Sequence, residues 1–205
     1  MKSHIATQSA ADRFFRAYQT HCTSPDLDSL FNLLNASHSL NDKMRKEYSS
    51  DFFSVKEFLA LKALRNLFHH QEELTNEIRI VASKNISAIT TDLMYLCLVP
   101  RSLVDKAIEG IEKKRKYQDE PLVRNALKWY ANVANINPCI FNFAVHVFER
   151  IESLDITLNS DGYRMIKESY EFENIHGHSH FVTGDIACLA GDVDAVLQTV
   201  YSDVL

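Results

Sequence analysis

The fold is decided by the stretch "SVKEFLALKALRNLFHHQEEL", residues 54–74. Its apolar residues recur at spacings of three and four, which is the period of one face of an α-helix. Ser54 followed by Glu57 predicts a capping box at the start of that helix, and Phe53 with Phe58 predicts a hydrophobic staple beside it. The apolar stripe continues beyond this stretch after one longer step, so we expect a central helix that ends near residue 80.

Periodic apolar patterns predict further helices on both sides of the central one. Their expected ranges are about 9–21, 26–48 with a weak point near residue 37, 102–116, 120–135, 138–154 and two more between 159 and 205. Pro138 opens one of them, as proline often does in a first helical turn. The apolar run "ISAITTDLMYLCLVP", residues 86–100, leaves a choice between a buried helix and a short strand open.

The composition favours a helical protein with a core of its own. The chain has 205 residues, 46% of them hydrophobic, with five glycines and four prolines. A chain of this length can bury enough apolar surface to fold as one domain. We therefore expect a single all-α domain over residues 1–205, with a helical-bundle core at about 9–155 and a helical C-terminal extension at about 156–205.

Charge and cysteine usage narrow the class of protein. The formal charge of −5 argues against a general nucleic-acid coat protein, because phosphate binding needs clustered Lys and Arg. The cysteines are widely scattered, which favours free thiols and a reducing, cytoplasmic location. They are Cys22, Cys97, Cys139 and Cys188. No segment approaches the roughly 18 apolar residues that a membrane span needs, so we expect no membrane partner.

Four polar residues lie beside the apolar stripe of the central helix: Arg65, Asn66, His69 and His70. Residues four apart share a row on a helix, so Asn66 and His70 lie on one row and Arg65 and His69 on the next. A row at the edge of a buried seam can line a cleft with a second helix or subunit. These residues are therefore the candidate functional site.

The hexapeptide "RNLFHH", residues 65–70, resembles the signature of the HEPN superfamily, an Arg, a polar residue after it and a His five to seven positions downstream on a helix. Arg65, Asn66 and His70 match in that order, and the resemblance covers about residues 54–81. It implies a helical bundle that dimerises and, in many members, a metal-independent endoribonuclease of toxin, CRISPR or phage-defence systems. On this basis we expect a homodimeric toxin–antitoxin or phage-defence effector that cleaves cellular RNA, with an antitoxin or inhibitor protein as partner.

The residue types suit this reaction. Cleavage of RNA through its own 2′-hydroxyl needs a base, an acid and positive charge near the phosphate in the transition state. His70 can transfer protons near neutral pH, and Arg65 can hold two phosphate oxygens. Asn66, one turn before His70, can orient the imidazole or bind a phosphate oxygen. One His cannot donate and accept a proton in the same step, so a symmetric dimer would supply the second; no metal or cofactor is expected.

Two other interpretations of the motif stay open. The chain could be a non-catalytic HEPN-type helical dimer that binds a protein or nucleotide partner. Alternatively, Arg65 could be solvated helix surface paired with Glu72 or Glu73, with His70 at a helix–helix seam. A second pair with the same spacing, Arg16 and His21, is the weaker match because a non-polar residue follows Arg16.

Two further segments carry chemistry of their own. The run "EKKRKY" could grip RNA phosphates, although a basic helix C-terminus also complements the helix dipole. Its candidate RNA-binding residues are Lys113, Lys114, Arg115 and Lys116. The segment "NIHGHSH" places His176, His178 and His180 at alternate positions, where an extended strand could present them to zinc. A metal-dependent phosphohydrolase would require these three histidines to share an ion.

Overall fold

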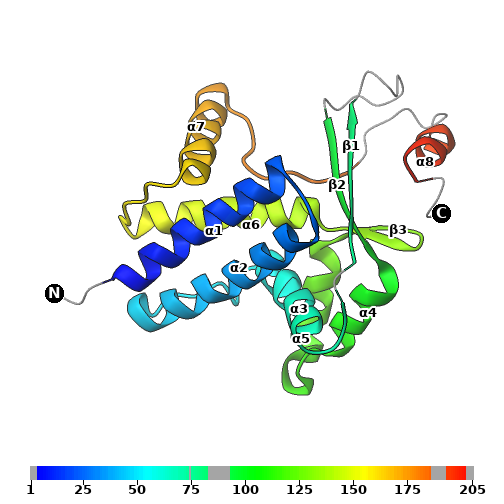
Figure 1. Ribbon diagram of the computed structural model, residues 1–205, viewed down its shortest axis with the longest axis horizontal. Helices are drawn as coiled ribbons and strands as arrows, with labels where there is room; N and C mark the ends of the chain where they lie inside the picture. The colour runs from blue at the N-terminus through cyan, green and yellow to red at the C-terminus, as the bar shows by residue number, and fades with distance from the viewer. Residues whose placement is uncertain (1–3, 74, 83–92, 186–192, 202–205) are drawn as a thin grey trace.

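A computed structural model describes residues 4–73, 75–82, 93–185 and 193–201 of the chain (Figure 1). Its helices are α1 (Ile5–Thr23), α2 (Leu27–Tyr48), α3 (Lys56–His70), α4 (Arg101–Glu109), α5 (Lys113–Ala126), α6 (Asn137–Ser153), α7 (Asp161–His176) and α8 (Val193–Tyr201). Its strands are β1 (Glu77–Ala82), β2 (Leu93–Pro100), β3 (Lys128–Tyr130) and β4 (Val133–Asn135). The expectation of a mainly helical protein is confirmed, whereas the all-α expectation is wrong because the strands form one sheet.

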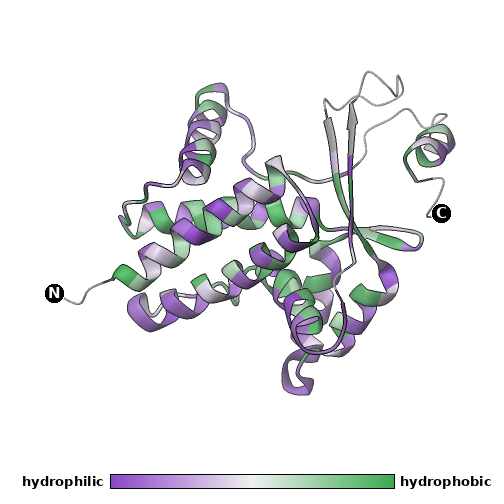
Figure 2. Cartoon of the chain, in the orientation of Figure 1, coloured by the Kyte–Doolittle hydropathy of each residue, from purple (hydrophilic) through white to green (hydrophobic). Residues whose placement is uncertain are grey.

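The main core lies where α1, α2, α3 and α6 pack together, with apolar residues of these helices turned inward (Figure 2). Phe143 of α6 lies at its centre. The ring centroid of Phe143 is 5.6 Å from that of Phe14, 5.2 Å from that of Phe52 and 5.6 Å from that of Phe58. The pairs of Phe143 with Phe14 and with Phe52 are edge-to-face, an arrangement that stabilises a core beyond its buried area. The same core holds α3, and therefore the "RNLFHH" motif, in place.

α2 begins with a capping box. The Asp26 carboxylate accepts a hydrogen bond from the Ser29 backbone N–H at 2.6 Å, and the Ser29 hydroxyl accepts one from the Asp26 N–H at 3.0 Å. The helix continues unbroken through Ser37, whose hydroxyl donates to the Leu33 carbonyl at 2.8 Å. That internal hydrogen bond satisfies the buried hydroxyl, so the weak point expected there does not break the helix.

α3 departs from the expectation at its start. It begins at Lys56 with Val55 as N-cap, and no side chain caps it, so the capping box expected from Ser54 and Glu57 does not form. Glu57 is instead buried, 4% exposed, and its carboxylate lies 3.6 Å from the imidazole of His146 on α6. Because the Glu57 side chain lies against His146 of α6, it does not serve the capping box.

α3 also ends earlier than expected. Phe53 and Phe58 pack with ring centroids 5.6 Å apart, as the staple predicts, but the helix stops at His70. The positions that continued the apolar stripe, Ile78 and Val81, belong to strand β1. β-Branched residues favour strands, and pairing with β2 satisfies the backbone polar groups of this segment. The helical spacing across residues 71–81 was therefore a coincidence.

The choice left open for residues 86–100 is settled for its described part, since residues 93–100 form strand β2; residues 86–92 lie outside the described residues. The antiparallel sheet has the order β1-β2-β4-β3. Cys97 and Val99 of β2 face the main core, whereas Leu96 and Leu98 face a smaller cluster with α8. Because both faces are covered, the strand reads as a continuous apolar run, and periodicity could not identify it.

The boundary between the helices expected at 102–116 and 120–135 is wrong. α4 stops before Gly110, and α5 contains the whole basic run, so this run opens a helix instead of closing one. Pro121, expected in a first turn, lies inside α5. The rest of the second range forms the β3–β4 hairpin, whose turn residue Ala131 has a positive φ of 38°. Sheet pairing has overridden the helical pattern there.

Later elements agree better with the sequence. Pro138 lies in the first turn of α6, as expected, and α7 and α8 are the two C-terminal helices. Cys22, Cys97 and Cys139 are free thiols, as expected, while Cys188 lies outside the described residues. Burial raises the pKa of the Cys97 thiol to about 12, which keeps it protonated. Among the described helices, none is long and apolar enough to cross a membrane.

Candidate functional site

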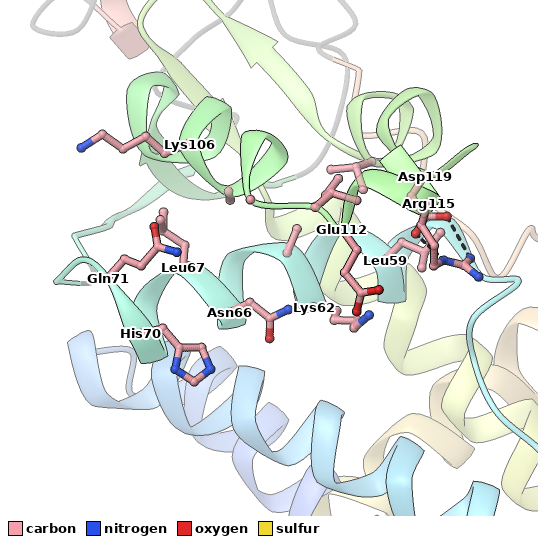
Figure 3. Close-up of a pocket in the computed structure, with 15 residues that line it drawn as sticks. Leu59, Lys62, Asn66, Leu67, His70, Gln71, Lys106, Glu112, Arg115 and Asp119 are labelled. Carbon is pink, nitrogen blue, oxygen red and sulfur yellow. Dashed lines mark hydrogen bonds and ion pairs between the residues drawn. The ribbon is translucent and has the colours of Figure 1, made fainter. Parts of the chain in front are cut away.

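One row of α3 lines a pocket. Asn66 and His70, which the sequence places on one helical row, both border a pocket of about 260 Å³ between α3, α4 and α5 (Figure 3). Lys62, one turn before Asn66, borders the same pocket, so the row carries an ammonium group, an amide and an imidazole in succession. His70 is exposed at the end of the helix, while Asn66 and Lys62 are half-buried.

Arg65 lies on the neighbouring row and faces α2. Its Nε donates a hydrogen bond to the Asn35 side-chain oxygen at 3.1 Å, and one terminal nitrogen donates to the Asn66 side-chain oxygen at 3.4 Å. Asn66 therefore joins the two rows. The sequence left open a pairing of Arg65 with Glu72 or Glu73, but the hydrogen bonds of Arg65 go to Asn35 and Asn66, and Glu72 pairs with Lys106 at 2.5 Å.

A further histidine, His38 of α2, lies near this second row. Its Nδ1 is 3.4 Å from the Asp42 carboxylate. Burial lowers the pKa of His38, the Asp42 carboxylate opposes that shift, and the charges of Arg65 and His69 add to the lowering. Helical periodicity on α2 alone could not have linked His38 to the motif, because their proximity depends on how α2 packs against α3.

The two adjacent histidines differ in their surroundings. Both His69 and His70 are exposed, and their ring centroids are 4.7 Å apart. His70 is one of the residues that line the pocket, whereas His69 is not. The two side chains thus lie on the two rows that the sequence predicts, and they can be tested against each other.

The candidate RNA-binding residues occupy the first turn of α5. Arg115 donates to both oxygens of the Asp119 carboxylate at 2.8 and 2.9 Å, and Asp119 is 5% exposed. The ammonium of Lys114 lies 2.9 Å from the Glu112 carboxylate, while Lys113 is exposed and Lys116 half-buried. Positive charge at a helix N-terminus opposes the helix dipole, so the interpretation as dipole complementarity is wrong. Of these four basic residues, Arg115 lines the pocket, at the opposite end from His70 (Figure 3).

The competing pair Arg16 and His21 does not form a site. His21 is 0% exposed, and its Nδ1 lies 3.2 Å from the Ser29 hydroxyl oxygen inside the protein. Burial lowers the pKa of His21 to about 4. A histidine that is buried and uncharged in this way serves packing and cannot meet a substrate.

The histidines of "NIHGHSH" do not converge. His176 ends α7, and its Nδ1 lies 2.8 Å from the Phe172 carbonyl oxygen. The ring centroids of His176 and His178 are 6.0 Å apart. His180 turns away to the Glu173 carboxylate at 2.6 Å and stacks on Tyr170. The extended strand that would align the three is absent, because α7 continues to His176. In the described part of the chain, no group of three His, Cys, Asp or Glu side chains is placed to hold a metal ion.

In comparisons with known proteins, no family model, no curated protein and no solved structure matches the chain.

Proposed function

We propose that this protein is a metal-independent endoribonuclease of HEPN type, in which His70, Arg65 and Asn66 act on a phosphodiester of single-stranded RNA. One observation carries the proposal. Asn66 and His70 border one open pocket at the exposed end of α3, and Arg65 is hydrogen-bonded to Asn66. Arg65 and Asn66 are thus hydrogen-bonded, and Asn66 shares the pocket with His70, which supports a joint role of the three residues on one phosphate.

Each group has a role in this reaction. His70 takes the proton of the 2′-hydroxyl, whose oxygen attacks phosphorus, and the 5′-oxygen leaves with a proton from an acid. Arg65 stabilises the charge on the phosphate in the transition state. Asn66 links Arg65 to the His70 row, so it positions the guanidinium relative to the imidazole. The products are a 2′,3′-cyclic phosphate and a 5′-hydroxyl.

A second copy of the chain completes the site. One imidazole cannot be base and acid in the same step, and the exposed end of α3 leaves His70 accessible to a symmetry mate. A two-fold axis near this end would bring the His70 of the second copy to the same phosphate. We infer a homodimer, acting in the cytoplasm as a toxin or phage-defence effector that an antitoxin or inhibitor protein restrains.

A non-catalytic HEPN-type dimer that binds a protein or nucleotide is the second candidate. The observation that favours it is the hydrogen bond from Arg65 Nε to Asn35, which uses part of the guanidinium inside the protomer. An arginine that serves to join α2 to α3 would leave the pocket for binding without chemistry.

The experiment that separates the two is incubation of purified protein with total RNA and tRNA in EDTA, followed by analysis of the product ends. The nuclease proposal expects cleavage with 2′,3′-cyclic phosphate or 3′-phosphate ends. Intact RNA at high protein concentration would leave the binding module as the function. Cleavage that appears only after addition of a divalent metal would contradict both.

A further inference from the structure

The pocket beside the motif has an apolar floor and a polar rim. The floor consists of Leu59, Ala63, Leu67, Ala107, Ile111 and Val123. Leu59, Leu67 and Ala107 are at most 4% exposed, so the floor belongs to the packed core. At about 260 Å³ the pocket falls below the roughly 300–1,000 Å³ of sites for drug-sized ligands. Its size therefore suits one flat ring system.

The rim presents hydrogen-bonding and charged groups above this floor. Asn66 brings an amide from α3, Gln71 brings one from the residue after α3, and Lys106 brings an ammonium group from α4 (Figure 3). Lys106 is held by Glu72 on the same side. A flat apolar floor with amide groups at its edge matches a nucleobase, which has apolar faces and a polar edge.

Lys62 adds a positive charge to the row of α3 that carries Asn66 and His70. Its ammonium lies 5.1 Å from the centre of the Phe53 ring. The pKa of the Glu112 carboxyl is lowered mainly by Lys114, and the charge of Lys62 adds to that lowering. Lys62, Asn66 and His70 follow one another at four-residue steps, which is about 6 Å each along the helix axis. Two such steps separate Lys62 from His70, a length comparable with two successive phosphate spacings in an extended strand.

We propose that this pocket binds the base of the nucleotide next to the cleaved bond, with Lys62 on the second phosphate from that bond. The inference rests on the proposed RNA cleavage at His70 and names the substrate contact that would orient the strand. The base lies against the apolar lining of the pocket, its edge meets Asn66 and Gln71, and the strand runs along α3 from Lys62 toward His70. Neither Lys62 nor the pocket wall on α4 belongs to the motif.

Gly110 offers a direct way to close the pocket. It borders the pocket and is exposed, and it has an ordinary helical φ of −72° that any residue can adopt. A Cβ built there would meet only the Ala107 and Lys106 carbonyl oxygens, both at 3.5 Å, which is normal contact. Gly110→Phe therefore adds a ring at the pocket wall, and Gly110→Ala is its matched control.

The first test measures binding of adenosine 5′-monophosphate and of inorganic phosphate to the full chain by amide NMR. Adenosine monophosphate should shift the amides of Gly110 and Ile111, and phosphate should leave them in place. Gly110→Phe should weaken nucleotide binding by about tenfold or more, a loss of about 1.4 kcal/mol or more, while Gly110→Ala stays within about twofold. Equal binding to both variants, or shifts with phosphate equal to those with the nucleotide, would overturn the base pocket.

The second test measures the role of Lys62 with a single-stranded ten-nucleotide DNA, which lacks the attacking 2′-hydroxyl. Lys62→Gln should weaken binding and reduce the slope of log K against log salt by about 0.7, the value for one lost phosphate contact on a single strand. Lys46→Gln on α2, an exposed lysine away from the pocket, is the control and should leave the slope unchanged. The same slope for Lys62→Gln and for the wild-type protein would overturn the phosphate contact.

RNA cleavage is measured in a separate assay, so the nuclease proposal and the base-pocket proposal can be refuted independently. Loss of nucleotide binding in Gly110→Phe together with an inactive wild-type protein would keep the pocket and remove the nuclease. An active wild-type protein whose KM for RNA is unchanged in Gly110→Phe would keep the nuclease and remove the pocket.

Discussion

Buried His21 should make the free energy of unfolding fall as the pH is lowered. Its Nδ1 lies 3.2 Å from the Ser29 hydroxyl oxygen, and that hydroxyl donates its own proton to the Asp26 carbonyl at 2.8 Å. Ser29 can therefore only accept, which places the imidazole proton on Nδ1. The other nitrogen, Nε2, is buried without a hydrogen-bond partner. Protonation would put an unpaired N–H and a positive charge in the core.

The size of the effect follows from the pKa. Burial lowers the pKa of His21 from 6.5 to about 4, with the Asp26 carboxylate opposing the shift. The unfolded chain then binds this proton at a higher pH than the folded protein. The contribution of neutral His21 is complete above pH 6.5 and is lost as the pH falls toward 4, a change of about 3 kcal/mol at 1.36 kcal/mol for each pH unit.

The assay is urea unfolding of the wild-type protein and of His21→Gln between about pH 7.5 and about pH 4.5. Glutamine can still donate to Ser29 but does not titrate. Down to about pH 4.5 we expect the pH dependence of the wild-type protein to exceed that of His21→Gln by about 2.5 kcal/mol, and exposed His178→Gln to match the wild-type protein. Parallel pH profiles for wild type and His21→Gln would refute the reasoning.

Three further predictions concern packing and assembly. Gly162→Ala should lower the free energy of unfolding by about 3 kcal/mol in chemical denaturation, because the new Cβ would lie 2.2 Å from the Phe15 carbonyl oxygen; an unchanged midpoint would contradict this close approach of α7 to α1. Asn41→Ala should lower the free energy of unfolding by about 1–3 kcal/mol in the same assay, because the buried Phe52 N–H, which donates to the Asn41 side-chain oxygen at 2.8 Å, would lose its acceptor. A smaller loss would mean that water replaces the amide. Light scattering at micromolar concentration should give twice the chain mass, and monomer alone would count against a shared site at the end of α3.

The local signals of the sequence located most helices, and tertiary contacts account for the errors. The start of α2 near Asp26 and the start of α6 at Pro138 are decided within one helical turn, and both helices begin close to where the pattern predicts. The Ser54–Glu57 capping box was equally plausible by spacing, but Glu57 pairs with His146, which is distant in sequence. The sheet was missed for the same reason, because β2 is identified by its partners on both faces and not by alternation.

The candidate site was predictable along one helix and not beyond it. Helical geometry placed Asn66 and His70 on one row and Arg65 on the next, as in the structure. Lys62 could have been found from the same four-residue step. Asn35 and His38 depend on the packing of α2 against α3, for which the sequence carries no spacing rule.

The central claim is tested most directly by RNA cleavage in EDTA by the wild-type protein, His70→Ala and His69→Ala. The two histidines are adjacent and exposed, yet only His70 borders the pocket with Asn66. If His70 transfers a proton, His70→Ala should reduce the rate by about 10² to 10⁴-fold with folding intact, and His69→Ala far less. Arg65→Ala should resemble His70→Ala, because it removes charge stabilisation in the transition state. Equal losses for the two histidine variants would show that the wrong row of α3 was assigned, and full cleavage by His70→Ala would contradict the nuclease proposal itself.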